Sequence, residues 1–179
     1  MTQRLILVCC LFNPNPKNKR PFLKYTIMKF FFNIPIFIIG LALMVLGARW
    51  MIVDQPWMLD QIANEERLGI TFDQLFNDEI NKTLPDYLKQ IYRFFGLWVI
   101  IIGLFVCGFS RHVMTSDSRT RVLLLTFVGI MSYSGLALAL FWIPSSPFIY
   151  LGCIMLILHA ASFYAHIRYI KPPKVIRGL

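Results

Sequence analysis

The stretch that decides the fold is residues 54–89, which read DQPWMLDQIANEERLGITFDQLFNDEINKTLPDYLK. It holds eight of the nine carboxylates in the chain, and the ninth is Asp117. The rest of the sequence consists of long apolar runs with basic flanks. This acidic segment therefore divides the apolar sequence and, by its contrast with the basic flanks, determines how apolar helices would cross a membrane.

The composition excludes an ordinary soluble domain. Of the 179 residues, 57 % are apolar and 15 % are charged, whereas soluble domains have roughly 45–50 % and about 25 %. A chain this short cannot bury so much apolar surface by itself, so we expect a lipid bilayer as its partner. The net charge of +9 does not indicate nucleic-acid binding, because the basic residues flank apolar runs and form no patch interleaved with aromatic residues.

Four apolar runs are long enough to form membrane-spanning helices. We expect spans at about 35–53, 92–110, 122–143 and 148–167, with an acidic segment at 54–91. The expected fold class is all-α, a transmembrane four-helix bundle with a short helical extracytoplasmic cap. Residues 30–170 form this membrane domain, between a basic cytoplasmic N-terminal segment (1–29) and a basic cytoplasmic tail (171–179).

Glycine spacing predicts where two of these helices meet. Gly40 and Gly47 lie seven residues apart in the first span, and Gly96 and Gly103 lie seven apart in the second. Residues seven apart share a helix face, and glycine at such positions lets a neighbouring backbone approach closely. We therefore expect close helix packing at these four residues.

The ends of the first span carry three residues with specific expectations. Asn33 is expected to cap the helix, and Pro35 to occupy its first turn, where a missing N–H costs nothing. Arg49 lies at the far end beside Trp50. One interpretation is an interfacial anchor whose charge reaches the headgroups. The alternative is a charge that lines a cavity and pairs with a carboxylate of the acidic segment.

The acidic segment itself has the pattern of two short amphipathic helices. Residues 54–56 form a plausible helix start, and Gly69 is a stop signal. Thr71 and Gln74 have the spacing of a capping box. An apolar face then recurs at helical spacing and is expected to be buried against the bundle or against a partner protein; it consists of Phe72, Leu75, Phe76 and Ile80.

The distribution of Lys and Arg predicts the orientation. With four spans, the N-terminal segment, the link between the second and third spans, and the tail share one side of the membrane, and these regions are the basic ones. The positive-inside rule places them in the cytoplasm. We therefore expect a multi-pass protein of the cell membrane, the bacterial inner membrane, with both termini cytoplasmic.

The N-terminal segment leaves the start of translation open. Arg4–Phe12 is apolar but too short to span a membrane, and no small-residue cleavage site follows it. Met28 begins a sequence typical of membrane proteins, so translation could start at Met1 or at Met28.

Histidines are the main candidates for chemistry within the apolar runs. His159 lies near the middle of the fourth span, His166 lies seven residues on, and His112 ends the second span. One interpretation is structural: His159 bonds across the bundle to Ser132, Tyr133 or Ser134, and the other two are interfacial. A second is cofactor binding, with His159 or the His112–His166 pair as haem or metal ligands. A third is a polar cavity for a quinone, lipid or small substrate, lined by Arg49, Tyr133, His159 and Ser162.

The layout of the chain resembles the small four-helix membrane proteins grouped as DoxX-like. The resemblance rests on the stretch RWMIVDQPWML after the first span, the segment Leu68–Ile70 in the loop, and the opening Arg93–Gly96 of the second span. It covers roughly residues 30–170. It implies at most an accessory role near quinol-oxidising membrane complexes and carries over no catalytic residue.

The sequence therefore predicts a multi-pass membrane protein, more specifically a non-enzymatic accessory or structural component, with a membrane protein partner or a second copy as its neighbour. No catalytic residue, metal or cofactor is predicted beyond the haem and quinone possibilities above. Two alternatives remain open, a redox- or quinone-linked enzyme subunit and a transporter of small molecules or lipids.

Overall fold

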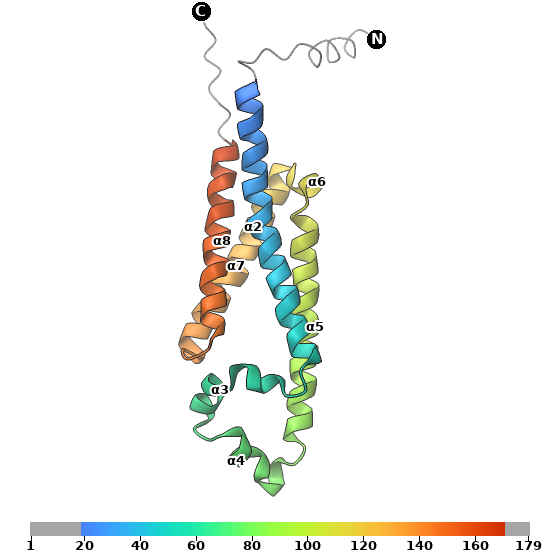
Figure 1. Cartoon of the computed structure of the whole chain (residues 1–179), viewed down its shortest axis with the longest axis vertical. Helices are drawn as coiled ribbons and strands as arrows, with labels where there is room; N and C mark the ends of the chain where they lie inside the picture. The colour runs from blue at the N-terminus through green and yellow to red at the C-terminus, as the bar shows by residue number, and fades with distance from the viewer. Residues whose placement is uncertain (1–18, 171–179) are drawn as a thin grey trace, which may run out of the picture.

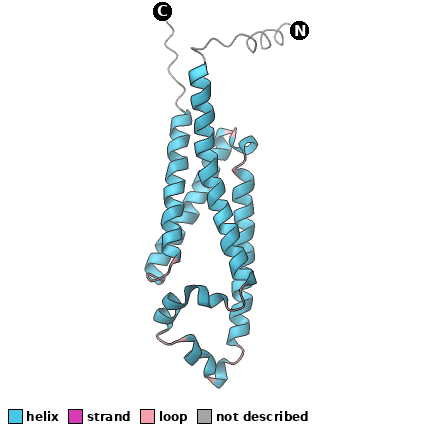
Figure 2. Cartoon of the chain, viewed as in Figure 1, coloured by secondary structure: helices cyan, strands magenta, loops and turns pink. Residues whose placement is uncertain are grey.

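The computed structural model describes residues 19–170, with side chains from Ile27 to Arg168. Within this range the chain forms helices and no strand (Figures 1 and 2). Predictions for the apolar run Arg4–Phe12 and for the tail 171–179 lie outside it. The elements are α2 (Lys19–Ile52), η2 (Pro56–Asp60), α3 (Gln61–Leu68), α4 (Phe72–Asn77), η3 (Glu79–Asn81), α5 (Leu84–Phe109), α6 (His112–Thr115), α7 (Ser118–Trp142) and α8 (Phe148–Ile170).

Four helical stretches within the described residues are long and apolar enough to cross a membrane: Ile27–Ile52, Glu79–Phe109, Ser118–Trp142 and Phe148–Arg168. Only 22 % to 33 % of their most apolar windows is buried inside the molecule. Most of their apolar side chains therefore face outward, which is stable against lipid tails but not against water. The expected all-α membrane bundle is confirmed.

Helices α2 and α5 cross at the predicted glycines. A Cβ atom added to Gly47 would lie 2.5 Å from the Gly96 carbonyl oxygen, and one added to Gly40 would lie 2.9 Å from that of Gly103. Both distances are too short for any side chain, so the two backbones are in direct contact. The close packing expected from the glycine spacing is confirmed, and α2 with α5 forms the tightest pair in the fold.

The opposite side of α2 packs against α8, which is also paired with α7 (Figure 1). The core between these helices contains Phe32, Ile36, Ile39, Leu125 and Val128, all at most 5 % exposed. These residues are contributed by α2 and α7. Because lipid tails are as apolar as these side chains, the core holds the helices together by close van der Waals packing and not by exclusion of water.

Pro35 differs from expectation, because it lies inside α2 and not in its first turn. The helix begins at Lys19 and continues through the proline. A proline in a helix interior removes one backbone bond and weakens the turn before it. Here Ser162 of α8 donates a hydrogen bond of 2.9 Å to the Phe32 carbonyl in that turn. The carbonyl that loses its N–H partner to Pro35 is that of Phe31, one residue earlier, so the Ser162 bond is an added link between α8 and this turn of α2.

Residues 53–83 form a helical cap on one end of the bundle, as predicted. Gly69 ends α3 with φ of +73°, and the Thr71–Gln74 capping box begins α4 with both of its hydrogen bonds present. The rings of Trp57, Phe72 and Phe76 pack together, with centroids 5.5 to 6.4 Å apart. Within the cap, Phe72 is therefore buried and Leu75 and Phe76 are half-buried.

Ile80 does not belong to that buried face, contrary to expectation. Its side chain is 85 % exposed. The reason is that α4 ends at Asn77, with Asp78 in an extended conformation, and residues 79–81 form a separate 3-10 turn. Helical spacing from Phe72 therefore no longer applies at Ile80.

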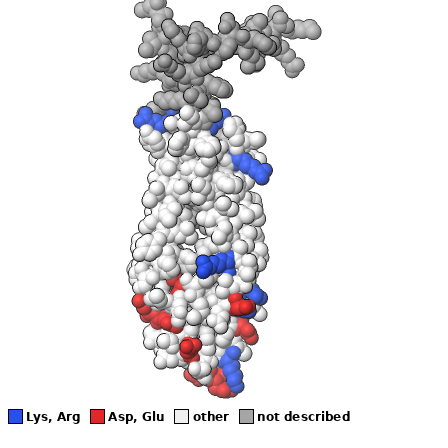
Figure 3. All heavy atoms as spheres, in the orientation of Figure 1, with Lys and Arg blue, Asp and Glu red and all other residues white. Residues whose placement is uncertain are grey.

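The charges separate along the long axis of the molecule. Figure 3 shows the acidic side chains on the cap, whereas the opposite end carries basic side chains. The surface between them is almost uniformly uncharged, apart from one basic group near the cap. This pattern matches an apolar belt with a polar region at each end, which is the surface that a bilayer requires.

Candidate functional sites

His159 lies in the apolar core between α8 and α7. Its Nε2 is 3.0 Å from the carbonyl oxygen of Leu125, so Nε2 must carry the proton and donate. The bond crosses the helix pair as expected, but it goes to a backbone carbonyl and not to Ser132, Tyr133 or Ser134, which was the prediction. Gly129 makes this possible, since a Cβ there would lie 3.1 Å from two atoms of the imidazole ring.

Tyr133 and Ser162, which were predicted to line a cavity with His159, have different positions. The Tyr133 ring meets the imidazole edge-on, with centroids 5.5 Å apart, and is half exposed on the outer face of α7. Ser162 is fully buried and bonded to the Phe32 carbonyl of α2. Tyr133 therefore contacts His159, whereas Ser162 links α8 to α2.

Three buried polar atoms in the bundle have no hydrogen-bond partner among the described residues: Asn33 Oδ1, Ser132 Oγ and His159 Nδ1. Ser132 and His159 come from neighbouring helices and are 4 % and 7 % exposed. The bare Nδ1 accepts hydrogen bonds, and the Ser132 hydroxyl donates them. The α7–α8 contact thus contains a complementary acceptor and donor that are both unsatisfied.

A second cluster joins three helices at the end opposite the cap, and Arg121 organises it. Arg121 is 5 % exposed and donates from Nη1 to the carbonyls of Thr115, at 2.7 Å, and Ser116, at 3.0 Å. Its Nε donates to Nδ1 of His166 over 3.4 Å. A cation at the carbonyl end of α6 is favourable. Sequence reasoning treated Arg121 only as a basic flanking residue and missed this role.

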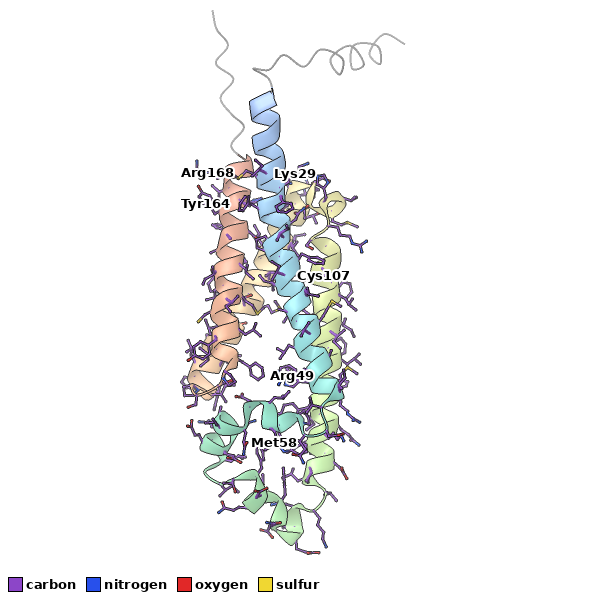
Figure 4. The ribbon with its side chains drawn as sticks, viewed as in Figure 1. Lys29, Arg49, Met58, Cys107, Tyr164 and Arg168 are labelled. Carbon is purple, nitrogen blue, oxygen red and sulfur yellow. The ribbon has the colours of Figure 1, made fainter. Side chains whose placement is uncertain are left out.

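His112 and His166, which were paired as candidate ligands, bond to different cations. His112 is exposed and accepts a hydrogen bond from the Lys29 ammonium over 3.2 Å. His166 is buried, contacts Phe32 with centroids 6.1 Å apart, and faces Arg121. Figure 4 shows Lys29 on α2 near the end that also carries Tyr164 and Arg168.

Arg49 is exposed on α2 close to the cap, as Figure 4 shows. The two ion pairs among the described residues join Lys82 to Glu79 and Lys89 to Asp54, so Arg49 belongs to neither. Its neighbour Trp50 lies among the rings of Tyr92, Phe95 and Phe148. An exposed arginine beside a tryptophan at the end of a span has the placement of an interfacial anchor.

Asp60 is the functional candidate that the sequence prediction did not single out. The side chain is 8 % exposed, and its Oδ1 has no hydrogen-bond partner among the described residues. Burial raises the pKa of the Asp60 carboxyl above its usual value, and the nearby Ser146 hydroxyl partly offsets this effect. In sequence Asp60 is one of eight similar carboxylates, so only its burial distinguishes it.

The cap also contains a half-open pocket of about 350 Å³ between η2, α4 and the start of α5. Its walls combine aromatic rings with carboxylates and one ammonium group. The Lys89 ammonium lies 2.9 Å from Asp54 and holds the pKa of that carboxyl below its usual value. The lining residues are Asp54, Gln55, Trp57, Met58, Phe72, Asp73, Phe76, Pro85, Asp86 and Lys89.

Comparisons of the chain with protein-family models, with curated proteins and with solved structures found no match.

Proposed function

We propose that this protein is a non-enzymatic accessory component of a cell membrane, of the DoxX-like kind, in which the cap forms the extracytoplasmic surface and both termini are cytoplasmic. One observation carries the proposal: three buried polar side chains of the bundle bond to main-chain carbonyls of other segments. His159 donates to Leu125, Ser162 to Phe32 and Arg121 to Thr115 and Ser116. Bonds of this kind fix helices in place.

The cap supports a role in partner binding. Trp57 and Phe72 are buried and Phe76 is half-buried, but Ile62 and Ile80 are 67 % and 85 % exposed. Exposed aliphatic side chains on a structured, charged surface are typical of a protein contact. A second membrane protein, or a second copy of this one, would cover them.

Photo-crosslinking from the cap tests this proposal. A photoreactive residue at Ile80 should form a discrete adduct with one protein, whereas the same residue at Asp78 or Asp73, which are exposed polar positions of the cap, should form less of it. The adduct should disappear when Ile62 and Ile80 are both replaced by Lys. Equal crosslinking at all positions, to many proteins, would contradict an accessory role.

A redox- or quinone-linked enzyme subunit is the second candidate, and the unsatisfied Ser132 Oγ and His159 Nδ1 favour it. A quinone carbonyl could accept a hydrogen bond from Ser132. Purified protein in mild detergent should be colourless and release no quinone on solvent extraction if the accessory role holds. A Soret band, or one equivalent of extracted quinone, that is lost in His159→Ala would establish the redox alternative.

A further inference from the structure

Asp60 belongs to a cluster that lies between the cap and the ends of the membrane helices. Asp60 belongs to η2. Ser146, which is buried in the turn between α7 and α8, faces the Asp60 carboxyl. Asn64 of α3 donates a hydrogen bond of 3.5 Å to the Tyr92 hydroxyl of α5. Tyr92 also lies close enough to Asp60 for the two groups to interact electrostatically. Four segments thus meet around one buried carboxylate.

The Ser146 hydroxyl donates to the Asp60 carboxyl, but one of the two carboxyl oxygens is left without a partner among the described residues. Oδ1 of Asp60 is fully shielded and without a hydrogen-bond partner among the described residues, and the ion pairs found there use Asp54 and Glu79 instead. An ionised carboxylate only accepts hydrogen bonds, and burying one without a cation is costly. The group that would stabilise Asp60 is therefore a cation with N–H bonds.

A group of aromatic rings lies at the ends of the membrane helices and is connected to this cluster through Phe148 and Tyr92. Trp50 contacts Tyr92, Phe95 and Phe148, with ring centroids 6.5, 5.1 and 5.7 Å away. The backbone N–H of Phe148 also donates to Ser146, which connects these rings to the Asp60 cluster. Aromatic faces beside a carboxylate are the combination that recognises an ammonium group.

The depth of the cluster indicates where the ammonium comes from. Trp50 lies two residues before the end of α2, and Phe148 is the first residue of α8, so the cluster lies where an apolar span meets the polar cap. Arg49, exposed on α2 beside Trp50, is the basic residue that Figure 4 shows just before the cap. A guanidinium at this level suits a lipid phosphate.

We propose that the Asp60 cluster binds a primary ammonium group, with Arg49 contacting the phosphate attached to it. The matching ligand is a phosphoethanolamine group, either the headgroup of a membrane lipid or a soluble molecule. Because the ammonium must reach a shielded oxygen, binding includes a small outward shift of the Asp60 side chain or of η2.

Lipid retention by the full-length protein tests the proposal. The protein is exchanged into nanodiscs with equal amounts of phosphatidylethanolamine and phosphatidylcholine of the same acyl chains, and the retained lipids are counted by native mass spectrometry. Both lipids carry the phosphate and a positive nitrogen, but the choline nitrogen has no N–H. We expect about tenfold preference for phosphatidylethanolamine, the size of one charge-assisted hydrogen bond.

Variants assign the preference to its residues. Asp60→Asn should abolish it, and Arg49→Gln should weaken retention of both lipids alike. Asp73→Asn, an exposed cap carboxylate, is the matched control and should behave as wild type. If soluble phosphoethanolamine displaces the lipid, the ligand is the soluble molecule. The binding of a primary ammonium group by the Asp60 cluster is then still supported. Equal retention of the two lipids by wild type, with no protection by soluble phosphoethanolamine, would overturn the proposal even if Asp60→Asn fails to fold.

Discussion

Single residues in this protein act mainly by the space they leave or the charge they bury. Gly129 leaves room for the His159 ring, while Gly135, six residues on in the same helix, faces open space. Asp60 is a carboxylate that burial has made a weaker acid. Substitutions of Gly129 and of Asp60 each give a prediction.

Replacing Gly129 by Ala should push the imidazole away from Leu125. The added methyl group would lie 3.1 Å from two ring atoms, so we expect a loss of about 1–3 kcal/mol in the free energy of unfolding in micelles, as for other overpacked cores. Gly135→Ala should be neutral or stabilising by up to about 1 kcal/mol. Equal effects of the two substitutions would mean that the His159–Leu125 contact is absent.

Asp60 should make cap stability depend on pH. A carboxyl whose pKa is raised by folding favours the folded state below its unfolded value of 3.8, and this contribution is lost as the pH rises through the folded pKa. Asp60→Asn cannot ionise, so its stability relative to wild type should increase as the pH rises from the unfolded pKa through the folded pKa of Asp60. Unfolding midpoints in lipid without amine headgroups measure this; a difference independent of pH would contradict it.

At the level of elements, the α2–α5 pair and the cap helix α4 are held by features visible in sequence. The α2–α5 pair depends on glycine, because two backbones in contact leave no room for a side chain. Helix α4 has only six residues and depends on its cap, because a helix that short has few internal bonds.

Gly47→Ala should separate α2 from α5. The new Cβ would lie 2.5 Å from the Gly96 carbonyl oxygen, so the helices must move apart, with a loss of about 2 kcal/mol or more. Gly108→Ala in α5 has no atom within 4 Å of its Cβ and is the matched control. Denaturation followed by circular dichroism would show both effects, and a stable Gly47→Ala variant would refute the packing.

Thr71→Ala should loosen α4 without affecting the bundle. The Thr71 hydroxyl accepts from the Gln74 N–H over 3.2 Å, and loss of such a cap costs about 1 kcal/mol. Amide exchange in α4 should therefore become about fivefold faster. Thr83→Ala is the control, since the Thr83 side chain makes no capping bond. Similar exchange in both variants would show that the capping box does not stabilise α4.

At the level of the whole molecule, charge asymmetry should fix the orientation. The cap holds eight carboxylates in or next to it, and the opposite end is basic (Figure 3). Alkaline phosphatase, which is active only outside the cytoplasm, should be active when fused after Asn77 and inactive after Ser116. The positive-inside rule is the reason. The reverse pattern would invert the proposed topology and place the Asp60 cluster in the inner leaflet.

The sequence by itself determined the number of spans, the glycine contact, the capping box and the Gly69 stop, because each depends on local spacing or on backbone conformation. It did not predict that α2 continues through Pro35, or that Ser162, 130 residues from Phe32, donates to the carbonyl of that residue. Nor did it distinguish Asp60 from seven other carboxylates or Arg121 from other flanking cations. Burial decides the role of both residues, and burial arises only when segments far apart in sequence pack together.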